Sequence, residues 1–155
     1  MNLLVLDIGG SSIKIAVMDE KHTIITRDKV KTPMDGMDAL FTCLDDIWKR
    51  YGSQVEGLAI SMPGVIDSAH GFAYTGGALR YLENRPFAKE LSERYHIPVW
   101  IGNDAKCAAL CEVTLGSLKD TGVGAVCIIG SGIGGAVTIG NNVLTGVHGF
   151  AGEFS

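Results

Sequence analysis

Segments rich in apolar and β-branched residues alternate along the chain with segments in which apolar residues recur at helical spacing. The first kind is typical of strands and the second of amphipathic helices. Strands are predicted at residues 3–6, 13–18, 22–30, 54–62, 98–101, 125–129 and 136–139, and helices at residues 37–51, 86–95 and 104–115. The continuous apolar run at residues 3–6 is typical of a strand that is buried on both faces. Strands mixed with helices predict an α/β fold, with a mixed sheet and flanking helices.

The turn between the first two strands carries the richest candidate chemistry. Asp7 stands where the first strand ends, Gly9–Gly10 let the backbone turn close to a ligand, and Ser11–Ser12 and Lys14 follow. The N–H groups of such a turn form a concave anion site, to which hydroxyl groups add. The carboxylate beside it could hold a hydrated Mg²⁺ ion. An ordinary hairpin explains the glycines but not the carboxylate, hydroxyl groups and lysine beside them, so we predict a phosphate site. Lys14 either contacts the phosphate or is a solvated lysine on the strand.

Residues 129–133, Ile-Gly-Ser-Gly-Ile, repeat the opening pattern of residues 8–13, Ile-Gly-Gly-Ser-Ser-Ile, within a shift of one residue. Each turn lies between two predicted strands, so the repeat suggests two similar lobes that each offer a glycine turn to one phosphate chain. Gly130, Gly132 and Gly135 also match the dinucleotide motif G-x-G-x-x-G. That motif needs a helix after the turn, and an alternating strand follows here, which excludes it.

Polar residues follow two further strands. Ser61, Pro63 and Gly64 end the fourth strand, and Asn103 and Asp104 end the fifth. Ligands of open α/β sheets bind outside the carboxyl ends of strands, which favours a site here. Either Asn103 or Asp104 could instead be the N-cap of the helix that follows.

Two glycine-rich segments lack periodicity. Residues 68–85, which include Gly77, form a long connection for a compact domain, and we expect a substrate-facing flap or else a mobile surface excursion. Residues 146–155 carry His148 and Glu153 among glycines, which suggests a ligand loop.

The composition fits one globular domain and narrows the function classes. Hydrophobic residues make up 46% of the 155 residues, which is enough for a core, and glycine is the outlier with 21. A net charge of −4 without a basic run argues against nucleic acid as a partner. No apolar run reaches the ~20 residues of a membrane span, and none resembles a signal peptide, so we expect a cytoplasmic protein without a membrane partner.

The four cysteines are scattered, at residues 43, 107, 111 and 127, and free thiols are expected in a cytoplasmic protein. Cys107 and Cys111 lie one helical turn apart and could share a metal ion. No histidine is near them in the sequence, which favours packing.

Five segments, in chain order, resemble motifs of the ROK family of bacterial sugar kinases and repressors. Residues 7–11 are similar to its D-x-G-G-T phosphate turn, with Ser in place of Thr, and residues 63–67 to its P-G-x-x-D. Residues 103–110 are similar to its N-D-A-N-A-A-A-L, residues 130–135 to its G-T-G-I-G-G second phosphate turn, and residues 151–154 to its A-G-E-F. The resemblance spans the whole chain and implies the actin/RNase H-like ATPase fold, in which two lobes flank a cleft.

The resemblance implies phosphorylation of a sugar hydroxyl by ATP with Mg²⁺, where the sugar is a hexose, an amino sugar or a β-glucoside. By the same resemblance Asp104 is the catalytic base, and the sugar is bound by Gly64, Gly77, Asn103, Asp104 and Glu153. The nucleotide is bound by Asp7, Gly9, Gly10, Ser11, Ser12, Lys14, Gly130, Ser131 and Gly132, with Asp7 carrying Mg²⁺. Many family members are homodimers. Residues 76–78 and 84–87, with the end of the chain, are similar to the β-glucoside kinase branch.

The chain departs from the family pattern in two ways. Ser155 stands where the family continues A-G-E-F with Gly-His, whose histidine begins a zinc site, so no zinc ligand is assigned here. Family members are about twice as long. We therefore expect a first lobe at residues 1–118 and the opening hairpins of a similar second lobe at residues 119–155.

Two rival hypotheses stay open beside the kinase. The family also contains sugar-sensing regulators, which carry a helix-turn-helix before the first strand, whereas a strand begins near residue 2 here. Alternatively, the 155 residues are a truncated piece without activity, in which the sheet of residues 123–155 leaves apolar faces uncovered.

Overall fold

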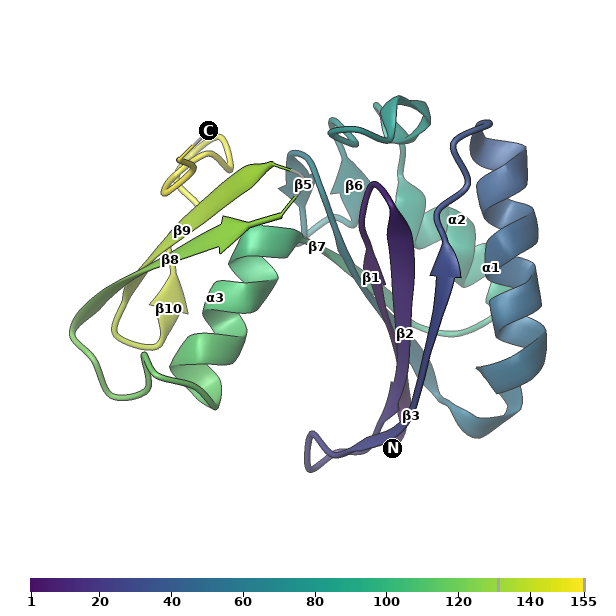
Figure 1. Ribbon diagram of the computed structural model, residues 1–155, viewed down its shortest axis with the longest axis horizontal. Helices are drawn as coiled ribbons and strands as arrows, with labels where there is room; N and C mark the ends of the chain where they lie inside the picture. Colours follow the sequence, from purple (N-terminus) through teal and green to yellow (C-terminus); the bar gives the residue numbers. More distant parts are fainter. Residues whose placement is uncertain (131, 155) are drawn as a thin grey trace. The chain divides into compact units, whose positions relative to one another are not determined.

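The computed structural model describes residues 1–130 and 132–154 and divides into two compact units, Met1–Gly102 and Asn103–Ser155. A five-stranded mixed sheet forms the first unit, in the order β3-β2-β1-β4-β7 (Figure 1). Its strands are β1 (Leu3–Ile8), β2 (Ser12–Met18), β3 (Ile24–Lys31), β4 (Gly57–Met62) and β7 (Val99–Asn103). β1 pairs antiparallel with β2 and parallel with β4, which confirms the predicted mixed sheet.

Two helices, α1 (Met37–Tyr51) and α2 (Phe87–Tyr95), cover one face of this sheet. A short 3₁₀ turn, η1 (Gly52–Gln54), follows α1. The core lies between these layers, because alternate residues of β1 and β2 pack against the apolar stripes of the helices. In β1, Leu4, Leu6 and Ile8 are fully buried, whereas Leu3 and Val5 are half-buried. The expectation that this strand is buried on both faces was therefore wrong, and its polar end residue Asp7 lies on the half-buried face.

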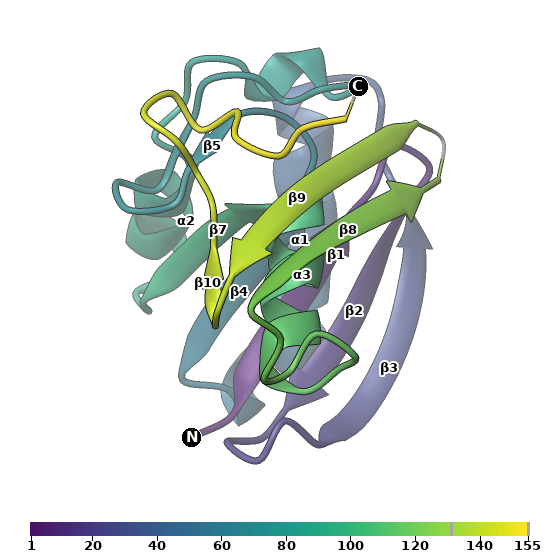
Figure 2. The same ribbon diagram turned by 90° about the vertical axis from the view of Figure 1, so that its left-hand side faces the viewer.

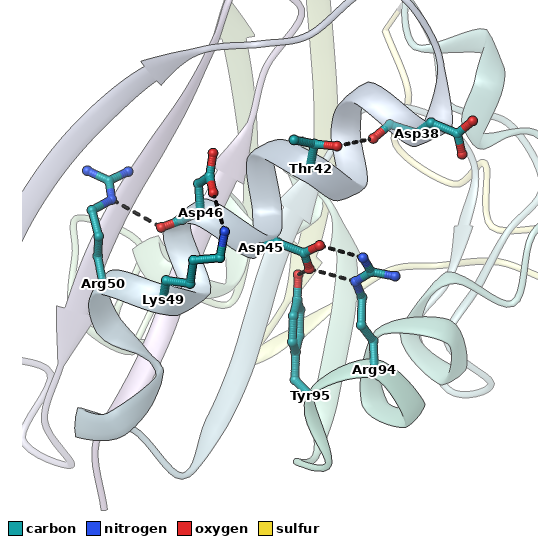
Figure 3. Close-up of polar contacts among 8 residues, drawn as sticks. All are labelled: Asp38, Thr42, Asp45, Asp46, Lys49, Arg50, Arg94 and Tyr95. Carbon is teal, nitrogen blue, oxygen red and sulfur yellow. Dashed lines mark hydrogen bonds and ion pairs between the residues drawn. The ribbon is translucent and has the colours of Figure 1, made fainter.

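A cluster of polar contacts joins α1 to α2 (Figure 3). The Asp45 carboxylate accepts two hydrogen bonds from the Arg94 guanidinium and one of 3.1 Å from the Tyr95 hydroxyl. The Tyr95 ring also stacks on Trp48, with 4.7 Å between the ring centroids. The hydrogen bonds from Arg94 hold the pKa of Asp45 below its usual value, and burial raises the pKa of Tyr95. This cluster fixes α2 on α1 and closes the core at that end of the two helices.

The segment at residues 68–85 is structured and anchored, which contradicts the mobile surface excursion, whereas the expectation that it faces a substrate stays a prediction. β5 (Ile66–Asp67) and β6 (Phe72–Ala73) form a small hairpin, and a 3₁₀ turn, η2 (Arg80–Leu82), follows. Ala73, Leu79 and Leu82 are all fully buried. The apolar anchors stand at irregular intervals, so neither helical nor strand periodicity revealed them in the sequence.

The second unit holds α3 (Asp104–Thr114) and a three-stranded sheet in the order β10-β9-β8. Its strands are β8 (Val123–Ile129), β9 (Ile133–Ile139) and β10 (Asn142–Val143). α3 lies along one face of the β8–β9 hairpin (Figure 2). Val123, Ile129 and Ile133 are more than half exposed. The predicted boundary between residues 118 and 119 stays a prediction, because it concerns the lobes of a longer protein.

Consecutive glycines in β9 allow close packing on both of its faces. A Cβ atom at Gly134 would lie 3.3 Å from the Cβ of Ala105 in α3, and one at Gly135 would overlap the Phe154 ring. Since neighbouring strand residues face opposite ways, α3 packs on one face of β9 and residues 152–154 pack on the other. No helix in the described part of the chain is long and apolar enough to cross a membrane.

Replacing Asp45 with Ala should destabilise the protein by about 1–2 kcal/mol at neutral pH, because Arg94 and Tyr95 lose a shared acceptor. The matched control is Asp46→Ala on the same helix. Asp46 pairs with Lys49 at 2.8 Å, and both side chains are well exposed, so we expect a change below about 0.5 kcal/mol. Urea unfolding of both variants measures the difference.

The pH dependence of the Asp45 effect follows from its lowered pKa. A carboxyl group whose pKa is lower in the folded than in the unfolded protein stabilises the fold fully above its unfolded pKa, and the stabilisation is lost as the pH falls through the folded pKa. The difference in unfolding free energy between the unsubstituted protein and Asp45→Ala should therefore become smaller below about pH 4. A difference that stays constant from pH 7 to pH 3 would contradict the assignment.

Candidate functional site

A row of three polar residues crosses neighbouring strands of the first unit. Asp7 on β1 is the register partner of Lys14 on β2 and of Ser61 on β4. The Lys14 ammonium lies 2.7 Å from Asp7 Oδ2, and the Ser61 hydroxyl donates to Asp7 Oδ1 at 3.2 Å. The Asp7 and Lys14 side chains are 41% and 68% exposed, so solvent screens their ion pair. The sequence identified Asp7 and Lys14 as candidates but did not show that they contact each other.

The glycine turn that follows β1 contains an internal hydrogen bond and further N–H groups that can bind a ligand. The Gly9 N–H donates to the Ser12 carbonyl at 3.0 Å, which completes the turn. Among the described residues, the N–H groups of Gly10 and Ser11 have no acceptor, and the Ser11 side chain is exposed. These groups can therefore donate to the oxygens of an anion.

Thr32, at the end of β3, braces the glycine turn. Its hydroxyl donates to the Gly9 carbonyl at 2.6 Å, and its N–H donates to the Ser11 carbonyl at 3.2 Å. The residue is 1% exposed. The sequence did not identify Thr32 as a site residue, because a hydrogen bond over 23 residues leaves no periodic signal.

Gly64 and Gly77 lie against each other where two loops meet. Gly64 has φ 103°, and a Cβ atom there would overlap the Thr75 carbonyl oxygen and lie 3.0 Å from the Gly77 nitrogen. Gly77 has φ 57°, a conformation that glycine adopts without strain. A Cβ at Gly10 would lie 3.6 Å from the Cβ of Ala78, so the residues after Gly77 lie beside the glycine turn. The structure therefore brings Gly64, Gly77 and the turn together at one end of the sheet.

Asp67, which ends the segment similar to P-G-x-x-D, shapes the β5–β6 turn. Its Oδ1 accepts from the N–H groups of Ala69 and His70 at 3.1 and 3.2 Å, and its Oδ2 lies 2.7 Å from His70 Nδ1. The hydrogen bond to the His70 side chain holds the pKa of Asp67 below its usual value. This carboxylate therefore orders the hairpin that carries the loop with Gly77.

In the second unit, Asn103 and Asp104 begin α3. The Asn103 side chain accepts from the Lys106 N–H at 3.0 Å and is the N-cap, which answers the question left open by the sequence. The Asp104 carboxylate accepts from the Ala105 N–H at 2.8 Å, at the first position of the helix. Asp104 is therefore not the cap residue, although the electropositive end of the helix stabilises its negative charge.

The second glycine turn joins β8 to β9, as the repeat predicted. The Gly130 N–H donates to the Gly132 carbonyl at 2.9 Å, and open space surrounds the Cα atoms of both glycines. Ser131, the third predicted member, lies outside the described residues. Both turns close an antiparallel hairpin, between Ile8 and Ile13 and between Ile129 and Ile133.

Glu153 forms an ion pair with Lys106 that was not predicted from the sequence. The Lys106 ammonium lies 3.1 Å from Glu153 Oε1 and donates to the Gly149 carbonyl at 2.7 Å. The side chains of Lys106 and Glu153 are 13% and 24% exposed. A signal was present, since Lys106 stands where the motif N-D-A-N has its second Asn. The structure thus groups Asn103, Asp104 and Glu153 within the second unit through the first turn of α3.

All four cysteines are free thiols, as predicted. Within residues 1–130 and 132–154, no set of three or more His, Cys, Asp and Glu side chains could hold a metal ion by itself. The pairing of Cys107 with Cys111 therefore has no further protein ligand in that part of the chain.

A protein-family model described as the ROK family matches residues 3–155. A β-glucoside kinase of Klebsiella pneumoniae is 34% identical, over 99% of this chain and 52% of the relative. The solved structure of the Lmo2764 protein of Listeria monocytogenes superposes with a TM-score of 0.92 at 30% identity, covering 99% of this chain and 53% of that one. A ROK glucokinase from Streptomyces griseus, in complex with glucose and AMPPNP, superposes with a TM-score of 0.88 at 26% identity, covering 99% and 49%. The chain spans about half the length of the curated relatives it matches.

Replacing Thr32 with Val keeps the shape of the side chain but removes the hydroxyl that holds Gly9. We expect a loss of about 1–2 kcal/mol of stability, because a partly buried carbonyl loses its partner, and faster exchange of the Gly9 amide, which is hydrogen-bonded inside the turn. Thr26→Val, on the same strand, is the control and should change stability by less than about 0.5 kcal/mol. Urea unfolding and amide hydrogen exchange measure both effects, and equal behaviour of the two variants would contradict the brace.

Proposed function

The chain belongs to the ROK family, and on that basis we propose that the whole protein transfers the terminal phosphoryl group of ATP to a sugar hydroxyl. The observation that carries the proposal is the turn of residues 9–12, which Thr32 braces and which directly follows the strand that carries Asp7, and whose N–H groups at Gly10 and Ser11 are left to bind an anion. Phosphoryl transfer requires mainly positioning and neutralisation of charge, and this arrangement supplies donors for phosphate oxygens. Relatives that are named as β-glucoside kinase, N-acetyl-D-glucosamine kinase and glucokinase support the same class of reaction.

We assign the nucleotide phosphates to the two glycine turns. The residues assigned in the first turn are Gly9, Gly10, Ser11 and Ser12, and the sequence motif assigns Gly130, Ser131 and Gly132 in the second. Backbone N–H groups in such turns act as fixed partial positive charges that need no reorganisation when phosphate arrives. Lys14 can add a positive charge, because its side chain is 68% exposed and its solvent-screened ion pair with Asp7 costs little to break.

Mg²⁺ fits the residues beside the first turn. Asp7 offers carboxylate oxygen, the ligand type that Mg²⁺ prefers, and it is 41% exposed. Both of its oxygens already accept hydrogen bonds, from Lys14 and Ser61, which favours a contact through the hydration shell of the ion. When bound with ATP, the ion neutralises charge on the phosphates.

We assign the acceptor sugar to Asn103, Asp104 and Glu153, which the second unit groups together. Gly64 and Gly77, which meet in the first unit, keep the sugar-binding role that the family resemblance implies. In this assignment the Asp104 carboxylate accepts the proton of the attacking hydroxyl, which leaves an oxygen able to attack phosphorus. The Glu153 carboxylate accepts hydrogen bonds from other sugar hydroxyl groups, and the Asn103 side-chain amide donates to one. Gly64 has to be glycine for the two loops to meet, since any side chain there would collide with the Thr75 carbonyl.

The 34% identity to a β-glucoside kinase supports a β-glucoside as the substrate. The similarity of residues 76–78 and 153–155 to the β-glucoside kinase branch supports the same substrate. A cytoplasmic location and a homodimer stay predictions of the sequence. A sugar-sensing regulator without catalysis is the rival that the following experiment separates.

A family-length protein that contains these 155 residues should phosphorylate at least one member of a sugar panel in an ATP-dependent manner. The panel is glucose, N-acetylglucosamine, N-acetylmannosamine, fructose and the β-linked disaccharide cellobiose, with the 155-residue chain assayed alongside. We expect turnover by the longer protein alone and the highest kcat/KM for the β-linked disaccharide. Saturable sugar binding without turnover on any sugar would favour the regulator and contradict the kinase.

Replacing Asp104 with Asn in the family-length protein should lower kcat by about 10²–10⁴-fold, the usual contribution of a general base. Sugar affinity should stay within about threefold, because Asn keeps a hydrogen-bonding oxygen at the start of α3. Asp46→Asn, on α1, is the control and should leave kcat unchanged. If kcat survives in Asp104→Asn, Asp104 is not the base.

A further inference from the structure

Lys106 occupies an unusual position for a lysine. It lies in the first turn of α3, where the unpaired N–H groups of the helix already carry partial positive charge. Its side chain is 13% exposed, although lysine is among the residues that are least often buried. A buried cation at the positive end of a helix is stable only if nearby acceptors compensate it.

Both compensating acceptors come from one short segment. The Lys106 ammonium donates to the Gly149 carbonyl at 2.7 Å and to Glu153 Oε1 at 3.1 Å. It therefore contacts the segment at its beginning through backbone and at its end through a side chain. Two anchor points four residues apart fix the conformation of the segment as well as its position.

The segment has little rigidity of its own. Gly146, Gly149 and Gly152 all have positive φ, so the sequence itself constrains the backbone weakly. Its internal hydrogen bonds include those from the Ala151 N–H to the Thr145 carbonyl at 3.2 Å and from the Glu153 N–H to the Phe150 carbonyl at 3.2 Å. Gly152 also packs closely on Val137 of β9, which seats the middle of the segment. Neither set of contacts fixes the Glu153 carboxylate, and the ion pair with Lys106 does.

We propose that Lys106 is the positioning residue of the acceptor-sugar site. By holding Glu153 and Gly149 against the first turn of α3, it sets the Glu153 carboxylate at a fixed place relative to Asn103 and Asp104. The sugar then meets acceptors that are already ordered, and binding does not have to order the glycine-rich segment. The inference rests on the assignment of Glu153 to the sugar in the proposed function.

The test compares four single variants and one double variant of the family-length protein. Lys106→Met keeps the length of the side chain and removes the charge and the donors, and Lys106→Arg keeps both. Glu153→Gln removes the negative charge of the partner. Lys89→Met is the matched control, because Lys89 forms an ion pair of 3.8 Å with Glu93 on α2, and both side chains are about 70% exposed.

Lys106→Met should raise the KM and the Kd of the sugar at least about tenfold while the KM of ATP changes less than about twofold. Tenfold is a low value for the loss of one partner from a hydrogen-bonded charge pair that is largely shielded from water. Lys106→Arg should recover most of the loss, and Lys89→Met should match the unsubstituted protein. The double variant Lys106→Met/Glu153→Gln should bind sugar no worse than Glu153→Gln, because Lys106 acts through Glu153.

Equal sugar affinity in Lys106→Met and Lys89→Met would overturn the inference. It would also be overturned if the double variant lost as much binding free energy for the sugar as the two single variants together. Amide hydrogen exchange of residues 149–153 separates this failure from a failure of the proposed function. If the unsubstituted protein phosphorylates no sugar, the kinase proposal fails, yet Lys106→Met should still speed exchange in this segment at least about tenfold. Unchanged exchange there would show that Lys106 does not hold the segment, whatever the reaction.

Discussion

The hydrogen bond from the Thr32 hydroxyl to the Gly9 carbonyl is the constraint on which the first candidate site depends. A glycine turn has many accessible conformations, and it binds an anion well only when its N–H groups already point the right way. Thr32 removes that freedom, and it can do so because β3 lies in register beside β2 with its last residues next to the turn. The register follows in turn from the alternating apolar residues of β1 and β2, which α1 and α2 bury on one face. In this way the packing of the core fixes the orientation of the Gly10 and Ser11 N–H groups.

The same logic holds in the second unit with different residues. Gly134 and Gly135 let β9 approach α3 on one face and residues 152–154 on the other. Because both neighbours come so near, the first turn of α3 and the segment with Glu153 are close enough for Lys106 to join them. The glycines that resemble a phosphate-binding motif thus serve two purposes. Gly130 and Gly132 stand in an open turn, whereas Gly134 and Gly135 permit packing.

Much of the fold was predictable from short-range patterns. The helix over residues 37–51 was predicted at its observed bounds, because its apolar stripe and its terminal glycine are local signals. Both glycine hairpins were predicted for the same reason. The anchored segment at residues 68–85 was missed, because Leu79 and Leu82 are buried by a tertiary arrangement that has no period in the sequence. Thr32 and Lys106 were missed as site residues, since their roles depend on contacts over 23 and 47 residues. The motifs predicted the candidate site residues, but not the residues that position them.

A crystal structure of the family-length protein with a non-hydrolysable ATP analogue would test the central claim most directly. The account predicts phosphate oxygens within hydrogen-bond distance of the N–H groups of Gly10 and Ser11, with the Thr32 hydrogen bonds to the turn intact. Phosphates bound elsewhere, or a turn whose Gly10 and Ser11 N–H groups point away from them, would contradict it.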